Sequence, residues 1–571
     1  MYILGINAAF HDTAAALVKD GKIIAAAEEE RFTHIKHGKR PLPFSTWELP
    51  FHAIDYCLKT AGITLKDVDR IAYSFDPEGV NEASVYEDAS YDDADTLVET
   101  STYKDWDTVF LNYIRKAPEQ LRDGYPHHLQ KRFSDVDDIA EKWVYVNHHI
   151  AHAASAFFPS PFTNAAVLTL DGRGEKATTG YFMGDNNTLT SIATVDMPHS
   201  LGMLYEKITT YLGFLHSSDE YKVMALASYG KPLYLEDFRS VIHVGDDGQY
   251  TIDEFDPAEW WGPGRKKDDV FGPLHFDIAH SLQKALEETV LKLVNWLYGQ
   301  TQAENLCMAG GVALNCVMNA VIRDQGPFKN VWIQPAAGDA GTALGAAQWI
   351  DVQVNATDST NKYTAEMEHV YWGPEYTDEE IEQFMIWAKT PYKRLNNVAK
   401  QTAEILAQNK VVAWYQGRME FGPRSLGSRS ILASPIHPEM QARLNDIKDR
   451  EDFRPVAPVV LEEDAADWFE DAKVSPFMLF VYPVKQEKAD RIPAVTHTDG
   501  TARVQTINRN QHPAYYDLIK EFKQITNVPV LVNTSFNTRG EPIVCSPRDA
   551  IECFWTSPFD ALIINSFILE K

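Results

Sequence analysis

The stretch VYVNHHIAHAASAFFPSPF, residues 144–162, carries three histidines within five positions. On a helix His148 and His152 are four residues apart and share one face, whereas His149 points elsewhere. Such a pair can bind one metal ion or one anion, but it is also typical of helical histidines that only make hydrogen bonds. The stretch therefore needs groups from other parts of the chain before its chemistry is defined.

Two aspartates are candidates for those groups. Asp171 ends an apolar run, NAAVLTLD, and Asp339 lies in the small-residue motif PAAGDAG. Two imidazoles with two carboxylates suit a divalent ion such as Fe(II), Mn(II) or Zn(II), and they leave coordination positions for a ligand. The predicted metal ligands are His148, His152, Asp171 and Asp339.

The elements that position these residues repeat along the chain. YILGIN predicts a strand, AAFHD a polar loop, and TAAALVKDGKIIAAAEE two strands about the turn at Lys19–Lys22. From residue 164 the order returns as a strand ending at Asp171, a glycine-rich loop and a hairpin turning at residues 184–187. Two similar halves with a cleft between them would explain the repeat, and chance similarity stays open.

Later segments alternate strands with helices. Residues 278–302 have helical spacing, NLCMAGGVALNCVMN and NVWIQPAAGDAGTALGAAQW each pass from a strand through a glycine turn into a helix, and polar residues mark a linker near 356–372. A second module follows, with the helix NVAKQTAEILAQN and the strands KVVAWYQG, TARVQTI, VPVLVNTSF and DALIINSFIL. This alternation predicts an α/β protein, with domains at 1–355 and 373–571.

Composition narrows the class of protein. The 571 residues are 44% hydrophobic, enough for large cores, and the net charge of -28 disfavours nucleic acid as a partner. Five cysteines without a CxxC pair favour a reducing compartment. We find neither a signal-peptide pattern at the N-terminus nor an apolar run long enough to span a membrane. We expect a cytoplasmic protein.

Residues 82–107 form a strongly acidic segment. It is interpreted either as a solvated loop or as a surface that attracts a cationic acceptor such as an amino sugar.

Three loops carry a resemblance. NAAFHDTAAAL, LDGRGE and AGGVALN, in this order, resemble the phosphate-1, phosphate-2 and adenosine loops of the ASKHA superfamily, whose glycines let backbone N–H groups approach phosphates. The resemblance implies a duplicated, ribonuclease H-like N-terminal domain. The nucleotide-binding residues that it implies are Asp12, Gly172, Gly174, Gly310, Gly311 and Asn315.

The second module narrows the family. YQGRMEFGPRSLGSRSIL, LNDIKDREDFRPVAPVV and LVNTSFNTRGEPIVCSPRDAI are similar to C-terminal signatures of the NodU/CmcH-type O-carbamoyltransferases. This resemblance covers essentially the whole chain and implies a C-terminal YrdC-like α/β domain. It implies that this domain makes carbamoyladenylate from ATP and carbamoyl phosphate. The N-terminal domain, with Fe(II) as the favoured metal, would then transfer the carbamoyl group to a small-molecule alcohol.

The residues of the second module agree with such a pocket. Residues 417–454 have a local charge balance of +1 in a chain of -28, which suits phosphate binding. Lys448 and Arg454 are candidate catalytic residues. Further candidates for binding ATP, which would carry Mg(II), are Arg418, Arg424, Arg429, Arg450, Arg503, Asn533, Ser535 and Arg539. Surface ion pairs for the arginines and turn-forming roles for Asn533 and Ser535 remain alternatives.

Two residues outside that module match the family as well. His11 follows the first strand and is a candidate to take the proton of the acceptor hydroxyl, with a hydrogen bond to a nucleotide phosphate as the alternative. Lys222, in HSSDEYKVMALASYG, is a candidate phosphate contact, with an ion pair to Asp219 or Glu220 as the alternative.

Three other functions share parts of the pattern. A sugar kinase would use the same loops but leaves the second module without a role, and an ATP-regulated binding protein needs no histidine pair. A tRNA threonylcarbamoyl-transfer enzyme would need an RNA-binding stripe, which is not evident. We expect an O-carbamoyltransferase with carbamoyl phosphate, ATP and an alcohol as its small-molecule partners, acting without membrane or nucleic acid, with a homodimer as a possible assembly.

Overall fold

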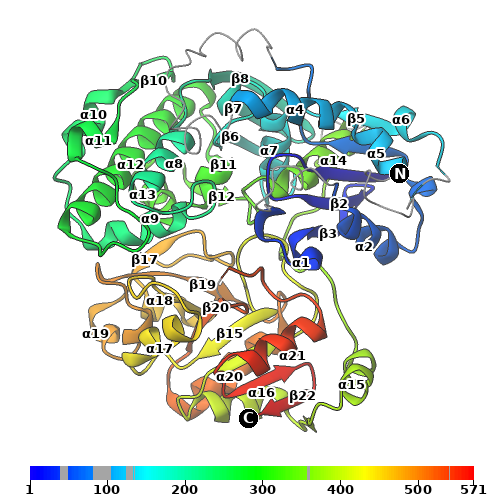
Figure 1. Ribbon diagram of the computed structural model, residues 1–571, viewed down its shortest axis with the longest axis vertical. Coiled ribbons are helices and arrows are strands. Elements are labelled where there is room, and N and C mark those ends of the chain that lie inside the picture. The colour runs from blue at the N-terminus through cyan, green and yellow to red at the C-terminus, as the bar shows by residue number, and fades with distance from the viewer. Residues whose placement is uncertain (39–48, 81–103, 124–132, 134–135, 357–360, 539) are drawn as a thin grey trace. The chain divides into compact units, whose positions relative to one another are not determined.

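The computed structural model describes residues 1–38, 49–80, 104–123, 133, 136–356, 361–538 and 540–571. They divide into two compact units, each assembled from separate segments. Figure 1 follows the chain by colour from the blue N-terminus to the red C-terminus. The first unit comprises residues 1–203, 297–313 and 328–367, and the second comprises residues 204–296, 314–327 and 368–571. The sequence predicted one N-terminal domain over residues 1–355. Residues 204–296 and 314–327 of that range belong instead to the second unit.

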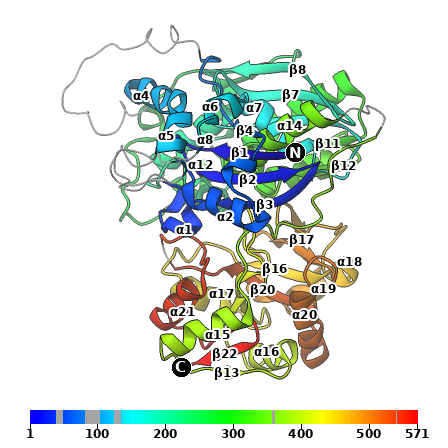
Figure 2. The same cartoon turned by 90° about the vertical axis from the view of Figure 1, so that its right-hand side faces the viewer.

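The first unit contains two sheets of the same design. One sheet has the order β3 (Lys22–Glu28), β2 (Ala14–Lys19), β1 (Tyr2–Asn7), β4 (Arg70–Tyr73) and β5 (Trp143–Tyr145). Figure 2 labels its strands β1 to β4. The other has the order β8 (Thr188–Asp196), β7 (Ala177–Asp185), β6 (Asn164–Leu170), β11 (Asn305–Ala309) and β12 (Asn330–Ile333). In each, a three-stranded antiparallel meander is followed by two parallel strands. The repeat predicted from the sequence is a duplicated ribonuclease H-like sheet, which confirms the ASKHA fold class.

Two helices join these sheets. The helix α14 (Ala340–Asn355) packs on β1, β2 and β4, and α7 (His148–Phe157) packs on β6, β7 and β11, while the two helices pack against each other. Small residues make the contact close: a Cβ on Gly345 of α14 would lie 1.8 Å from the carbonyl oxygen of Ala151 on α7. Position 345 therefore has no room for a side chain, and the orientation of α7 depends on it.

Short helices complete the first unit. They are α1 (Glu30–Thr33), η1 (Lys36–Gly38), α2 (Phe51–Ala61), η3 (Leu65–Asp67), α4 (Lys104–Arg115), α5 (Ala117–Asp123), α6 (Ile139–Lys142) and η5 (Gly311–Leu314). Most of the acidic segment that begins at residue 82 lies outside the described residues, which resume at α4.

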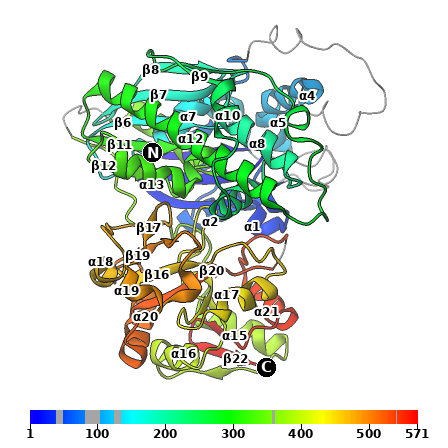
Figure 3. The same ribbon diagram turned by 90° about the vertical axis from the view of Figure 1, so that its left-hand side faces the viewer.

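A long helix runs from the second unit into the first. It is α12 (Pro273–Thr301), which begins five residues before the start predicted at residue 278. Other elements of residues 201–325 are α8 (Leu201–Tyr211), α9 (Glu220–Leu226), η4 (Ala227–Tyr229), α10 (Leu235–Val241), the hairpin of β9 (Ile242–Val244) and β10 (Tyr250–Ile252), α11 (Pro257–Trp261) and α13 (Cys316–Gln325) (Figure 3).

The C-terminal part of the second unit is built on a mixed eight-stranded sheet. Its order is β13 (Lys393–Arg394), β22 (Phe567–Glu570), β21 (Ala561–Ile564), β14 (Val412–Tyr415), β15 (Arg429–Ala433), β20 (Val530–Ser535), β16 (Ala457–Leu461) and β19 (Gln505–Ile507). A small sheet pairs β17 (Val481–Pro483) with β18 (Thr501–Arg503). The helices are α15 (Asp378–Trp387), α16 (Val398–Leu406), α17 (Glu439–Ile447), η6 (Glu462–Asp464), α18 (Ala465–Trp468), α19 (Gln486–Ala489), η7 (Pro493–Val495), α20 (Pro513–Thr526) and α21 (Pro547–Thr556).

Two local predictions differ from this architecture. The stretch DALIINSFIL, expected as one strand, is the hairpin β21–β22, because Asn565 adopts a left-handed φ of 46° at its turn. The strand expected over TARVQTI is divided at Val504 between β18 and β19, which belong to different sheets. Arg503 consequently ends the strand of the small sheet.

Across the described residues, none of the helices combines the length and apolar character required to cross a membrane.

Candidate active sites

The helix α7 presents two histidines on one face, as their spacing predicts. Asn147 caps the helix by accepting a hydrogen bond from the backbone N–H of Ile150, which places His148 at the first helical position. His152 follows one turn later and is fully buried. His149 turns away and makes hydrogen-bond contacts with the hydroxyl of Thr169 at 2.7 Å and the carbonyl of Ala177 at 2.8 Å.

Two loops bring carboxylates to these histidines. Asp171 directly follows β6, and its Oδ1 accepts a hydrogen bond from the backbone N–H of Gly311 at 2.7 Å. Asp339 is the N-cap residue of α14 and is 4% exposed. The cluster therefore draws on the two helices that pack together and on the end of a central strand, and the fold supplies the carboxylates that the histidine spacing alone cannot.

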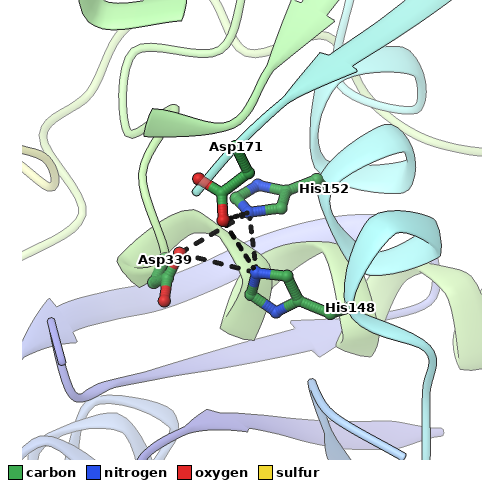
Figure 4. A group of neighbouring side chains, drawn as sticks. All are labelled: His148, His152, Asp171 and Asp339. Atoms are coloured by element: carbon green, nitrogen blue, oxygen red, sulfur yellow. Dashed lines mark hydrogen bonds and ion pairs between the residues drawn. The ribbon is translucent and has the colours of Figure 1, made fainter. Parts of the chain in front are cut away.

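The four side chains converge closely (Figure 4). The Nε2 atoms of His148 and His152 are 3.1 Å apart. The Oδ2 of Asp171 lies 3.4 Å from the first Nε2 and 3.9 Å from the second, and the Oδ1 of Asp339 lies 3.6 Å from each. One ligand atom from each of the four residues lies within 4.8 Å of the other three.

This geometry fits a metal ion. Ligand atoms about 2.1 Å from a shared tetrahedral ion are separated by about 3.4 Å, close to the distances found here. Asp339 Oδ1 is buried without a hydrogen-bond partner in the described part of the chain. Two imidazole nitrogens that face each other also need either a hydrogen on one of them or a shared metal ion, because two lone pairs repel. The predicted donor set is thus assembled as one site.

The electrostatics of the site favour positive charge at its centre. Burial alone would lower the pKa of His148, but the carboxylates of Asp339 and Asp171 raise it well above the usual range. Burial and the neighbouring Asp339 would raise the pKa of Asp171, but His148 and His152 lower it to about 2. The carboxylates are therefore ionised and suited to cation binding.

A second layer of polar groups orients the ligands. The ring of His148 contacts the carbonyl oxygen of Ser74 through Nδ1 at 3.2 Å, which directs Nε2 to the cluster. The buried carboxylate of Glu175 accepts hydrogen bonds from the backbone N–H of His148 at 2.9 Å and from the amide of Asn147 at 2.8 Å. The sequence alone did not identify Ser74 or Glu175. Glu175 could have been found, because it is the acidic residue that ends the loop LDGRGE, which the sequence analysis singled out.

His11 lies at the edge of the same cluster. Its Nε2 is 3.7 Å from Asp339 Oδ2, and its Nδ1 is 3.1 Å from Asp12 Oδ2. The other oxygen of Asp12 is 2.8 Å from Nδ1 of His37. The carboxylate of Asp12, a predicted nucleotide ligand, is thus occupied by two imidazoles.

The predicted glycines lie in the loops beside the cluster. Gly310 has φ 94°, and a Cβ there would be 2.1 Å from the carbonyl oxygen of Leu170. A Cβ on Gly174 would be 2.9 Å from the ring of His149, whereas Gly172 has open space. Close packing explains two of these glycines without invoking a nucleotide. Asn315, assigned with them, caps α13 by accepting from the N–H of Met318 and hydrogen-bonds with Gln283.

A second concentration of charge lies within the second unit. Burial and the nearby Arg503 lower the pKa of Arg424 to about 9, and burial and Arg454 lower that of Arg450 to about 9. A guanidinium keeps its proton in proteins, so these directions express burial of the charge first and crowding of like charges second. Arg424 Nε and one terminal nitrogen of Arg450 are buried without a hydrogen-bond partner among the described residues. A bound anion would relieve both conditions.

The segment around Lys222 borders this arginine cluster, defined as Arg424, Arg450, Arg454 and Arg503. Lys222 Nζ is 3.0 Å from Glu451 and 3.1 Å from Asp219, and Glu451 also lies 3.5 Å from Arg454. The guanidinium of Arg454 is 4.8 Å from the ring centre of Tyr221. Lys222 therefore makes the ion pair considered as its alternative role, next to groups that suit phosphate.

Other predicted residues of the second module are tied to its framework. Arg429 is fully buried over the ring of Tyr415 and donates to the carbonyls of Gln416, Gly417, Ser428 and Pro374. Arg418 donates to the carbonyls of Trp372 and Gly373. Asn533 donates to Ser425 and Gln505 inside the sheet. These contacts favour structural roles.

Lys448 directly follows α17, and its side chain reaches the end of β20. Its Nζ lies 3.1 Å from the hydroxyl of Ser535 and 2.6 Å from the amide oxygen of Asn537. Ser535 donates to the same amide oxygen at 2.8 Å. The three polar side chains form one network beside the strand end. Arg539, predicted with them, lies outside the described residues.

Family models of two domains match the chain: the carbamoyltransferase N-terminus over residues 2–348 and the carbamoyltransferase C-terminus over residues 403–571. The chain belongs to the carbamoyltransferase family. This result confirms the predicted family and makes the protein a transferase.

Several relatives match nearly the whole chain. Nodulation protein NolNO of Sinorhizobium fredii is 39% identical over 576 residues, which cover 99% of this chain and 80% of the relative. Nodulation protein U of Rhizobium fredii is 40% identical over 585 residues, covering 95% of this chain and 91% of the relative. An uncharacterized protein of Synechocystis is 41% identical over 627 residues, covering 100% and 97%.

Solved structures show more distant likeness. HypF of T. kodakarensis is 14% identical with a TM-score of 0.33, covering 62% of this chain and 48% of that one. The ROK hexokinase of Thermus thermophilus is 13% identical with a TM-score of 0.30, covering 62% and 100%.

Proposed function

We propose that this protein uses ATP to convert carbamoyl phosphate to carbamoyladenylate and transfers the carbamoyl group to a hydroxyl of a small molecule. Membership of the carbamoyltransferase family supports carbamoyl transfer. The observation that carries the rest is the presence of two different charged sites, a buried cluster of two histidines and two aspartates in the first unit and an arginine cluster in the second. The first suits a metal and the second suits phosphates.

Activation is assigned to the arginine cluster. Carbamoyl phosphate loses inorganic phosphate to water and yields carbamate; a carbamate oxygen then attacks the α-phosphorus of ATP, and pyrophosphate leaves. The two substrates, carbamoyl phosphate and ATP, are polyanions, and their mutual repulsion must be offset before both can occupy one pocket. Arg424, Arg450 and Arg503 would hold their oxygens, and Arg454 and Lys448 remain the candidate catalytic residues.

Transfer is assigned to the first unit. The acceptor oxygen attacks the carbamoyl carbon, the bond to AMP breaks, and the hydroxyl proton must be removed as the new ester forms. His11 Nε2 faces this site and would take the proton. A divalent ion held by His148, His152, Asp171 and Asp339 would supply Lewis acidity to the developing negative charge.

The experiment compares one variant from each site. Arg424→Ala is expected to abolish pyrophosphate release from ATP and carbamoyl phosphate but to transfer from supplied carbamoyladenylate. Asp339→Ala is expected to release pyrophosphate but not to carbamoylate the acceptor, even with supplied adenylate. Arg239→Ala is the matched control, because this arginine pairs with Glu236 and Glu288 on the surface and should leave both activities unchanged.

Other outcomes would change the assignment. Normal transfer but no pyrophosphate release in Asp339→Ala would reverse the roles of the two sites, and loss of both activities in both folded variants would indicate one composite site. Phosphorylation of the alcohol by ATP would instead support the sugar-kinase alternative. The acceptor, the native metal, cytoplasmic location and a homodimer stay predictions from sequence and family.

A further inference from the structure

The contacts of Asp12 point to a role different from nucleotide binding. An ionised carboxylate only accepts hydrogen bonds, and each Asp12 oxygen lies opposite the Nδ1 of one imidazole, His11 at 3.1 Å and His37 at 2.8 Å. Although burial raises the pKa of Asp12, the charge of His37 and the hydrogen bonds of both histidines hold it below the usual range. A carboxylate with both oxygens engaged, and with a charge that repels phosphate, is a poor nucleotide ligand.

The backbone around Asp12 is held independently of its side chain. Asp12 adopts φ 50°, its backbone N–H donates to the carbonyl of His37 at 3.1 Å, and the amide of Asn7 donates to the carbonyls of His11 and Asp12. These bonds fix the loop after β1 whether or not the imidazole of His37 is present. The side-chain contact between Asp12 and His37 is therefore separable from the shape of the loop.

The contact with Asp12 determines which ring nitrogen of His11 carries the proton. If Asp12 accepts from Nδ1, the proton of the neutral His11 ring is on Nδ1, and the lone pair is on Nε2. That Nε2 is the atom 3.7 Å from Asp339, on the side of the histidine–aspartate cluster. The ring is thus set in the tautomer that a proton acceptor needs, as a carboxylate sets the imidazole in other hydrolytic and transfer enzymes.

His37 completes the arrangement. Its Nδ1 contact occupies the second Asp12 oxygen, which prevents the carboxylate from rotating away from His11. Its Nε2 is buried and has no hydrogen-bond partner among the described residues. Within that part of the chain, the ring nitrogens of His37 therefore make a side-chain contact only with Asp12, through Nδ1. His37 is absent from every motif that the sequence singled out, and only the fold brings it to Asp12.

We propose that Asp12 and His37 are positioning residues that hold the His11 ring with its unprotonated Nε2 on the side of the histidine–aspartate cluster. This inference rests on the proposed carbamoyl transfer for its catalytic consequence, but the orientation of His11 can be tested without it. The substitution that separates the roles is His37→Asn, whose amide can donate in place of Nδ1, compared with His37→Leu, which cannot donate.

The first measurement is ring ¹⁵N NMR of the full-length protein, labelled at histidine and loaded with diamagnetic Zn(II), with His11 assigned by its absence in His11→Gln. Wild type and His37→Asn should show His11 protonated at Nδ1. Asp12→Ala and His37→Leu should show a mixture of tautomers. A His11 ring unchanged in both latter variants would overturn the proposal.

The second measurement is transfer from supplied carbamoyladenylate. His37→Leu should lower kcat about tenfold with little change in the KM for the acceptor, and His37→Asn should restore most of it. Pyrophosphate release should be unaffected. Equal losses in His37→Asn and His37→Leu would also contradict the proposal, because the donated hydrogen bond would not be the property that matters.

The matched control is His52→Leu. His52 Nδ1 lies 2.6 Å from Glu29 Oε1, so this change removes a similar imidazole–carboxylate contact in the same unit, from a pair that includes neither His11 nor Asp12. His52→Leu should leave the His11 tautomer and kcat unchanged. A decrease in kcat equal to that of His37→Leu would mean that general destabilisation causes both decreases, which would contradict the proposal. If wild type transfers no carbamoyl group at all, the proposed function fails, while the NMR result still decides the positioning of His11.

Discussion

The Nε2 atoms of His148 and His152 lie 3.1 Å apart, one helical turn separating the two residues on α7. Neutral imidazoles could satisfy this contact only with one ring donating to the other, and two ionised carboxylates face the same point. The pair is thus arranged for a shared cation, which makes its dependence on metal directly measurable.

Replacing His152 by Ala should remove bound divalent metal from the purified protein without unfolding it, because alanine is favourable in a helix and only a ligand is lost. Acceptor carbamoylation should be lost with the metal. Metal content by elemental analysis and helicity by circular dichroism test this expectation. His243→Ala, at an exposed pair with Asp253, is the control; full metal content in His152→Ala would exclude His152 as a ligand.

Gly345→Ala should disturb the metal site from a distance. The new Cβ would lie 1.8 Å from the carbonyl of Ala151, so α14 and α7 must separate and move both histidines. We expect a loss of about 1–3 kcal/mol in the free energy of unfolding and weaker metal binding. Gly299→Ala on α12 is the matched control, because its Cβ meets no atom within 4 Å and alanine there should be neutral or stabilising. Equal stability of both variants would contradict the close packing of the helices.

Arg429→Ala and Arg424→Ala should differ in stability. Removing Arg429 leaves several buried carbonyls without a donor, so we expect a loss of about 3 kcal/mol or more. Removing Arg424 relieves repulsion by Arg503, and Tm should stay the same or rise while ATP binding weakens. Thermal unfolding and equilibrium nucleotide binding test both expectations. An Arg424→Ala protein that unfolds as readily as Arg429→Ala would make Arg424 a structural residue.

The stability of the protein should fall in mild acid because of His512. Burial and the charge of Arg429 lower the pKa of this histidine to about 4 in the folded protein, against about 6.5 when unfolded. Between these values the unfolded chain binds more protons, so the contribution is complete above about pH 6.5 and is progressively lost as the pH falls to about 4, by about 3 kcal/mol.

His512→Asn should flatten this pH dependence while retaining the N-cap of α20, because the asparagine side chain can accept from the N–H of Tyr515 as His512 does. Chemical unfolding at several pH values measures the slope. A slope that is unchanged by the substitution would show that other groups control acid stability.

Local patterns in the sequence determined much of this protein. The alternation in YILGIN and AAALVK, the Lys19–Lys22 turn and the helical spacing of His148 and His152 appear as β1, β2 and α7, because each depends on neighbours within a few residues. The same sequence predicted the family that the comparisons confirm. It also named all four residues of the histidine–aspartate cluster.

Tertiary structure decided what long-range contacts control. Spacing along the chain could not show that His37 meets Asp12, that Glu175 supports His148, or that Arg429 is enclosed by carbonyls while Arg424 has a nitrogen without a partner in the described chain. An arginine in a glycine-rich motif looks the same in sequence whether its donors face backbone or ligand. The difference is set by desolvation and by which strands and loops pack around it, and those neighbours are defined only by the fold.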